Sequence, residues 1–287
     1  MILRKARVSA VCFLVVSTAV AQKPQVEVTS PLGRDLMSLP DSDGAIHAAE
    51  EKLKADPKNP ALVVALSKAY AAKRQYQEAV AVCTRGLTLA PNNADIYLEK
   101  GHRELGLRKF EAAKADLTRA VELNPKQPDS YYHLGLANYF LRHFDKASEA
   151  FGHALEIAKT PDSVIDCSNW AYVSLRRAGK KEAAGRVLAR ITPDIVNTEP
   201  HLFFYLQLLH FYQGKLTEEQ VLPPRPTGPD DIEGELSFDT INYGVGNWYL
   251  YNHDAAKARE HFKKVVAGYA WNSWGFIGSE IELSRNE

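Results

Sequence analysis

The sequence lacks several features that would point to particular classes of protein. Its 35 basic and 35 acidic side chains balance, so there is no basic excess of the kind that marks a nucleic-acid-binding protein. Only three of the 287 residues are cysteine, which excludes a scaffold held together by disulfides. A glycine-rich phosphate loop and a nucleophile elbow are both missing. What remains is a chain with 45% hydrophobic residues, a proportion typical of a folded protein.

The one long apolar run lies at the N-terminus and is too short to span a bilayer. It covers residues 8–21 after a basic start formed by Arg4, Lys5 and Arg7, whereas a spanning helix needs about 20 apolar residues. It ends in Ala19-Val-Ala21, the small-x-small form that signal peptidase cleaves. We therefore predict a signal peptide over residues 1–21, with export to the periplasm or the cell exterior. An uncleaved anchor is the alternative.

Three kinds of residue recur along the chain at one constant interval. A proline, a small residue and an aromatic residue each return at this interval, always at the same distance from one another. The recurring residues are Pro57, Pro91 and Pro125, then Ala79, Ala113 and Ala147, then Tyr76, Phe110 and Phe144. A fixed period of about 34 residues indicates a repeat architecture in which each unit is one helix pair.

Each recurring residue has a physical role in an antiparallel pair of helices, here called helix A and helix B of a unit. Gly101 and Gly135, with Ser67 in the first unit, allow helix A to approach helix B closely. The recurring alanines do the same from helix B, and the aromatics place the start of helix B against helix A. The proline cannot continue helix B and therefore ends it.

This pattern resembles the tetratricopeptide-repeat family. The resemblance implies an all-α solenoid of antiparallel helix pairs, wound as a right-handed superhelix with a concave binding face. After a flexible tail (22–43), the expected segments are an N-terminal cap helix (44–59), three repeats (60–93, 94–127 and 128–161), a divergent fourth repeat (162–193), a divergent helix pair (194–222), a linker (223–236), a repeat-like unit (239–272) and a capping helix (273–287). Thr217 and Gln220 have the spacing of a capping box.

The sequence offers no constellation for catalysis or metal binding. Cys83 and Cys167 lie three repeats apart, too far for a disulfide, so we expect two free, buried thiols. His253 and His261 could share a helix face, but no third ligand has a useful spacing. We therefore predict no catalytic residues, no metal, no cofactor and no enzymatic activity. A subunit of an envelope enzyme with an unrecognised catalytic site is the alternative.

The resemblance also implies which residues line the concave groove. Carrying the family's groove positions onto this sequence gives an apolar and aromatic surface suited to an extended segment or a helix of a partner. Tyr132 and Tyr139, seven residues apart on one face, are its central candidates. The groove residues expected here are Lys68, Leu98, His102, Tyr132, Leu136, Tyr139, Phe140, Tyr243, Asn247 and Tyr251.

The last unit carries a second, narrower resemblance. The run from Asn242 to Leu250, followed by Ala258 to Val266, is similar to the last repeat of NlpI-like bacterial envelope adaptors. Together these features predict an exported, non-enzymatic adaptor or scaffold that binds a protein or peptide segment, with no nucleic acid partner and no stable membrane insertion. Self-assembly of solenoids into a homodimer is a further alternative.

Overall fold

The computed structural model describes residues 24–199 and 203–285, so the predicted signal peptide lies outside the described residues. Within them the structure is helical apart from one two-stranded hairpin. This confirms the all-α fold class. Among the described residues, no helix is long and apolar enough to cross a membrane.

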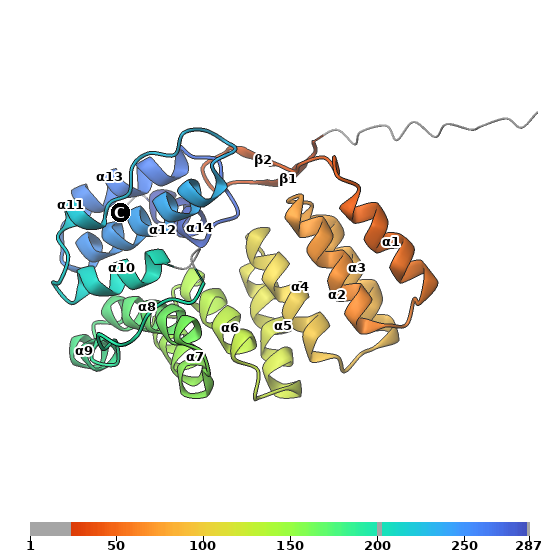
Figure 1. Ribbon diagram of the computed structural model, residues 1–287, viewed down its shortest axis with the longest axis horizontal. Coiled ribbons are helices and arrows are strands. Elements are labelled where there is room, and N and C mark those ends of the chain that lie inside the picture. Colours follow the sequence, from red (N-terminus) through yellow and green to blue (C-terminus); the bar gives the residue numbers. More distant parts are fainter. Residues whose placement is uncertain (1–23, 200–202, 286–287) are drawn as a thin grey trace, which may run out of the picture.

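The first part of the chain is a row of helix pairs that recur with the period seen in the sequence. Successive pairs begin at Pro60, Ala94 and Pro128, and Figure 1 shows them curving round in one arc. The helices of this part are α1 (Ala45–Ala55), α2 (Pro60–Ala72), α3 (Tyr76–Leu89), α4 (Ala94–Gly106), α5 (Phe110–Leu123), α6 (Pro128–Phe140), α7 (Phe144–Ile157), α8 (Pro161–Arg177) and α9 (Lys181–Leu188).

Local signals set where these helices begin. The side chain of Asn59 accepts a hydrogen bond from the Ala61 N–H at 3.1 Å, and that of Asn93 accepts one from the Ile96 N–H at 2.9 Å. Both satisfy backbone donors that a helix start otherwise leaves unpaired. Pro128 occupies the first position of α6, where a missing N–H costs nothing.

The predicted close approach within each pair is present. A Cβ atom at Gly101 would lie 2.6 Å from Leu117 Cγ, and one at Gly135 would lie 2.7 Å from the ring of Phe151. A Cβ atom at Gly246 would lie 2.6 Å from the ring of Phe262. The last helix pair therefore packs like the early repeats, because in each case helix B lies directly against a glycine of helix A.

The aromatic residues at the start of helix B reach beyond their own pair. Tyr76 packs against Gly106, where a Cβ would lie 2.5 Å from its ring, and the Phe110 ring lies 5.4 Å from that of Phe140. Gly106 and Phe140 belong to helix A of the next repeat. These aromatics therefore join one repeat to the next, rather than only fixing the angle within a pair.

The second half of the chain departs from the regular repeat. Its helices are α10 (Phe203–Tyr212), α11 (Glu218–Val221), α12 (Ile232–Tyr251), α13 (Ala255–Val266) and α14 (Trp274–Leu283). The predicted capping box is confirmed, with Thr217 and Gln220 bonding each other's backbone at the start of α11.

The predicted linker over 223–236 is only partly correct, because α12 already begins at Ile232. Asp231 accepts a hydrogen bond from the Gly234 N–H at 3.0 Å and so caps the helix. Glu235 on the first turn is buried and accepts a hydrogen bond from the Tyr269 N–H at 2.6 Å. This extra turn therefore forms because the segment after α13 packs on it.

The predicted flexible tail is wrong for residues 24–43. Strands β1 (Val26–Thr29) and β2 (Asp35–Met37) pair as an antiparallel hairpin, and Figure 1 shows them bridging from α13 and α14 to the α2–α3 pair. Arg34 donates to the backbone oxygens of Val266 and Gly268 at 3.1 and 3.2 Å. On the other side, the Leu39 N–H donates to the Lys73 oxygen at 2.7 Å.

One side chain of the hairpin completes an apolar cluster between the two ends of the arc. Leu36 is 1% exposed and packs with Tyr76 of the first repeat and with Trp271 and Phe276 of the C-terminal part. The Trp271 Nε1–H donates to the Met37 oxygen at 3.1 Å. These partners lie far apart in the sequence. The composition of the segment alone therefore gave no sign of the contact and suggested a tail.

Replacing Leu36 with alanine is expected to lower the free energy of unfolding by about 2–4 kcal/mol, because the side chain leaves a cavity between three elements. Leu39→Ala is the matched control. Its side chain is 42% exposed, so its loss should cost well under about 1 kcal/mol. Chemical denaturation of the two variants measures the difference, and equal values would contradict the bridging role.

Candidate functional site

The centre of the predicted groove is filled by the chain's own C-terminal helices. The Tyr139 hydroxyl on α6 donates to Asn247 Oδ1 on α12 at 3.0 Å, and the Tyr243 hydroxyl donates to that of Tyr139 at 3.2 Å. The Trp170 ring of α8 lies 5.2 Å from Tyr139 and 6.2 Å from Tyr243. Helix α12 therefore lies against the concave face of α6 and α8.

Five of the ten residues predicted to line the groove are consequently core residues. Their exposed fractions lie between 0% and 4%, so a partner does not reach them in this structure. They are Leu136, Tyr139, Phe140, Tyr243 and Asn247. The face of α6 that carries Tyr139 is covered by a later helix of the same chain.

The other five predicted residues keep exposed surface. Lys68 is exposed, and Leu98, His102, Tyr132 and Tyr251 are half-buried. Of these, Tyr251 lines one opening of the concave face, and His102 and Tyr132 line another. The structure therefore does not bring the ten residues together in one groove.

The tryptophan that opens α14 covers a further part of the concave face. The Trp274 ring lies 5.3 Å from His102 on α4 and 6.1 Å from both His133 and Phe140 on α6. Burial lowers the pKa of His102 well below its usual value, so this imidazole is neutral near pH 7. It packs as an aromatic surface rather than as a cation.

Three arginines that the motif search missed hold the C-terminal part in place. Arg74, Arg108 and Arg142 occupy the turns between helix A and helix B, all with positive φ of 54–63°. Arg74 donates to the Tyr269 oxygen at 3.0 Å, and Arg142 lies 3.6 Å from Glu282. These arginines recur at the same interval as the prolines, so the period that revealed the prolines could also have revealed them.

The middle arginine forms the most buried of these contacts. Arg108 donates through Nη2 to Glu280 Oε2 at 2.6 Å and to the Trp271 oxygen at 2.8 Å. The two side chains are 6% and 1% exposed. Such a pair carries a large desolvation cost that only its own hydrogen bonds offset, so it fixes one relative position of α14 and the second repeat.

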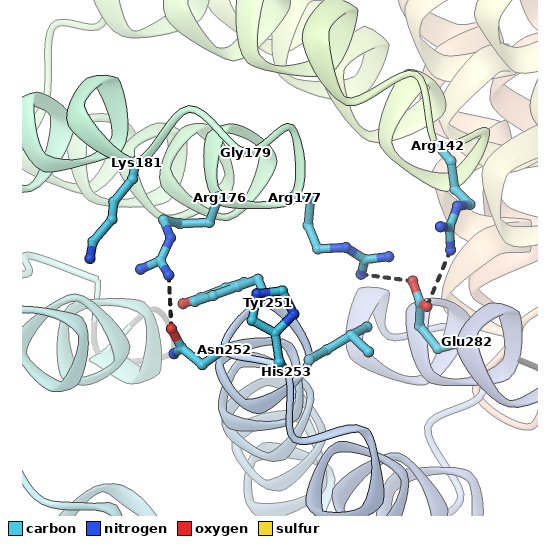
Figure 2. Close-up of a pocket in the computed structure, with 10 residues that line it drawn as sticks. Arg142, Arg176, Arg177, Gly179, Lys181, Tyr251, Asn252, His253 and Glu282 are labelled. Carbon is cyan, nitrogen blue, oxygen red and sulfur yellow. Dashed lines mark hydrogen bonds and ion pairs between the residues drawn. The ribbon is translucent and has the colours of Figure 1, made fainter.

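Beyond this contact, one end of the concave face opens as a basic cleft of about 620 Å³ (Figure 2). We call this opening the basic cleft. Its lining residues come from the turn after α6, the turn between α8 and α9, the end of α12 and α14. They are Arg142, Arg176, Arg177, Gly179, Lys181, Leu250, Tyr251, Asn252, His253 and Glu282. Three arginines and a lysine thus face a single carboxylate.

The cations of the basic cleft differ in how firmly they are held. Arg177 donates to Asn247 Oδ1 and to Glu282 Oε1 at 2.8 and 2.9 Å. Arg176 donates to Asn252 Oδ1 at 2.9 Å and lies 4.2 Å from the Tyr251 ring. Lys181 forms no ion pair with any residue that the structure describes. Figure 2 shows Lys181 and Arg176 lying on the same side of the opening.

A second opening is lined by residues near the opposite ends of the helices α6, α8, α12 and α14. It is a cavity of about 290 Å³ lined by five tyrosine, phenylalanine and tryptophan rings from four elements, and we call it the aromatic cavity. The rings belong to Tyr76, Tyr132, Phe204, Tyr205 and Trp274. On α8 it is lined by Asp166, ten residues before Arg176 of the basic cleft. At 1.5 Å per helical residue the two openings are about 15 Å apart, with the packed tyrosines between them.

The described residues contain no group of three or more histidine, cysteine, aspartate or glutamate side chains that could hold a metal ion. Cys83 and Cys167 are free and buried, as predicted. Burial raises the pKa of the Cys83 thiol to about 11, which disfavours the thiolate that nucleophilic chemistry needs. The side chains that line the two openings offer cationic groups in one and aromatic rings in the other.

Comparison with protein families decides the identity of the repeats. One tetratricopeptide-repeat model matches residues 37–100, and a second model of the same repeat matches residues 98–163. Residues 37–163 of the chain are therefore tetratricopeptide repeats. Tetratricopeptide repeats mediate protein–protein interaction and are in general not enzymes, so adaptor or scaffold is the class of function that the family supports.

Solved structures of tetratricopeptide-repeat proteins resemble the fold. A repeat protein from Parabacteroides merdae is 19% identical, with a TM-score of 0.51 over 85% of this chain and 92% of its own. MamA is 25% identical, with a TM-score of 0.45 over 61% of this chain and 91% of its own. YrrB, described as having an unusual peptide-binding site, is 15% identical, with a TM-score of 0.46 over 78% and 93%. No curated protein matches the chain.

Proposed function

We propose that this protein is a non-enzymatic adaptor or scaffold of the bacterial cell envelope that binds an acidic segment of a partner protein in the basic cleft. The observation that carries the proposal is the surplus of cations around the opening. Arg142, Arg176 and Lys181 face the cavity, while its one carboxylate, Glu282, lies 2.9 Å from Arg177 and 3.6 Å from Arg142.

The shape of the basic cleft suits a peptide segment. Its volume of about 620 Å³ falls within the range of ligand-binding pockets, and Tyr251 adds an aromatic surface beside the cations. Arg176 is held against that ring and by Asn252, so part of the entropy of ordering it is already lost before a ligand binds.

Charge removal tests the proposal with labelled octapeptides of glutamate and of lysine as probes. Removing two cations by Arg142→Ala plus Lys181→Ala is expected to weaken glutamate-peptide binding roughly tenfold, since each exposed pair contributes about 0.5–1 kcal/mol. Fluorescence anisotropy at low and high salt measures the affinity, which should fall as salt screens the charges. Any binding of the lysine octapeptide should be unaffected by this double substitution, because it does not involve the cleft.

The matched control removes two cations elsewhere. Lys263 and Lys264 are exposed on α13 and line none of the cleft, so Lys263→Ala plus Lys264→Ala gives the same charge change. Equal loss of affinity in both double variants would show that only net charge matters, and the assignment of the cleft would fail. Thermal melts of both variants confirm an intact fold.

Location in the envelope is proposed from the N-terminal segment and the likeness of the last unit to envelope adaptors. Fractionation of bacterial cells expressing the full chain tests it directly. The mature protein should appear outside the cytoplasm and begin at Gln22, which N-terminal sequencing detects. A chain that stays in the cytoplasm with residues 1–21 attached would contradict this part of the proposal.

A further inference from the structure

The aromatic cavity contains a carboxylate without a partner. Asp166 Oδ1 is buried and accepts no hydrogen bond from any residue that the structure describes. A buried carboxylate that is left unpaired costs several kcal/mol unless it binds a proton or a cation. The side chain belongs to α8, whose neighbouring residues Ile165 and Cys167 are core residues, so its backbone position is fixed by packing.

The rings around this carboxylate come from elements that lie far apart in sequence. Tyr132 belongs to α6, Tyr205 to α10, Trp274 to α14 and Tyr76 to α3. The Tyr205 hydroxyl is fixed by the Trp170 Nε1–H, which donates to it at 3.4 Å. Four elements thus place aromatic rings around one cavity, and this convergence is what a cation needs for favourable contact with ring faces.

Among the residues that the structure describes, the other charged groups near Asp166 include no free cation. Arg103 of α4 lines it, but its Nε donates to Glu99 Oε1 at 2.7 Å. His102 is neutral for the reason given above. Burial is the main cause that raises the pKa of Asp166. The nearby negative charges of Asp162 on α8 and Asp129 on α6 raise this pKa further.

We propose that the aromatic cavity binds the cationic side chain of a lysine or arginine presented by a partner protein, with Asp166 as its counter-ion and the rings of Tyr132, Tyr205 and Trp274 around it. The cavity of about 290 Å³ accommodates one long side chain rather than a folded segment. The proposal shares with the proposed function only the premise that the ligand is a protein, and it concerns a different opening.

The occupant follows from the chemistry of the cavity. An anion would meet Asp166, and an apolar side chain would leave the Asp166 oxygen unpaired. A lysine or arginine side chain places apolar methylenes against rings and a charge beside the carboxylate, as such side chains do when they cross an apolar layer. The arginine plane also stacks on aromatic faces, so arginine should bind more tightly than lysine.

Small amides of single amino acids test the proposal on the full chain. N-acetyl-arginine amide is expected to bind at least about tenfold more tightly than the neutral isostere N-acetyl-citrulline amide, with isothermal titration as the measurement. Asp166→Asn keeps the shape of the side chain and should remove this difference. Asp145→Asn, which changes an exposed carboxylate paired with Lys180, is the matched control and should retain it.

The pH dependence separates a counter-ion from a carboxylate that only packs. Burial raises the pKa of Asp166 to about 8, so the empty site holds a proton near pH 7. A bound cation requires the ionised form, and the affinity for the arginine amide should therefore rise from pH 6 to pH 9 and level off above the pKa. In Asp166→Asn this rise should disappear.

Two results would overturn the proposal. One is equal affinity for the arginine and citrulline amides in the unaltered protein. The other is an affinity that is the same in Asp166→Asn as in the unaltered protein, with thermal melts showing that both fold. The glutamate octapeptide in the basic cleft should bind Asp166→Asn unchanged, so failure of the aromatic cavity and failure of the proposed function give different results.

Discussion

Replacing Arg108 with alanine is expected to lower the free energy of unfolding by about 3–5 kcal/mol, the range for removing one partner of a buried ion pair. The substitution leaves Glu280, which is 1% exposed, without its cation, and removes the hydrogen bond to the Trp271 oxygen. Denaturant titration followed by circular dichroism measures the loss. The C-terminal helices should also become more susceptible to proteolysis, because this pair holds α14 on the second repeat.

Two further variants test whether the loss of stability in Arg108→Ala comes from the buried ion pair. Arg119 and Glu122 form an exposed pair, with side chains 41% and 58% exposed, so Arg119→Ala should cost less than about 1 kcal/mol. The double variant Arg108→Leu plus Glu280→Leu removes both buried charges and should recover part of the loss. A small cost for Arg108→Ala, similar to that of Arg119→Ala, would show that the contact is not closed in solution.

The second large effect is expected at Tyr139, the residue that helix spacing places at the centre of the concave face. Tyr139→Ala should lower the free energy of unfolding by about 3–5 kcal/mol, as for other buried aromatic residues. The ring contacts Phe144 and Trp170, and its hydroxyl joins Asn247 and Tyr243. Thermal and chemical unfolding measure the effect, which should appear without any partner present.

Comparison with a surface tyrosine and with phenylalanine divides this effect into its parts. Tyr269 is 50% exposed, so Tyr269→Ala should change stability little. Tyr139→Phe keeps the ring and should cost about 1 kcal/mol or somewhat more for the lost hydrogen bonds. If Tyr139→Ala unfolded no more easily than Tyr269→Ala, the concave face would be open in solution and the original groove prediction would regain its basis.

The regular repeats were readable from sequence because their signals are local. Pro60, Asn59 and Asn93 act on the helix that they start, and Gly101 and Gly135 act on the helix that follows directly in the chain. Such contacts recur in each repeat and are therefore visible as a period in the sequence. The same holds for the turns that contain Arg74, Arg108 and Arg142, here called the arginine turns. Their spacing is visible in the sequence, although their partners are not.

The candidate sites were less predictable because their partners come from the other end of the chain. Tyr132 and His102 were predicted as groove residues, yet the cavity that they line is completed by Trp274, which belongs to the last helix. Nothing in the alternation of polar and apolar residues distinguishes a face covered by a partner from one covered by α12 or α14. Asp166 gave no signal, because a single aspartate in a helix is usually solvated.

The sequence by itself determined that this chain is an all-α protein of regularly repeated helix pairs, because each pair is fixed by short-range sterics and caps. Only the tertiary structure decided that the arc closes on itself through the β1–β2 hairpin and the arginine turns, and that the concave face stays open in two places. Closure depends on hydrogen bonds between residues as far as 234 positions apart, such as Arg34 with Gly268. Long-range contacts of this kind leave no period in the sequence, since each is made once.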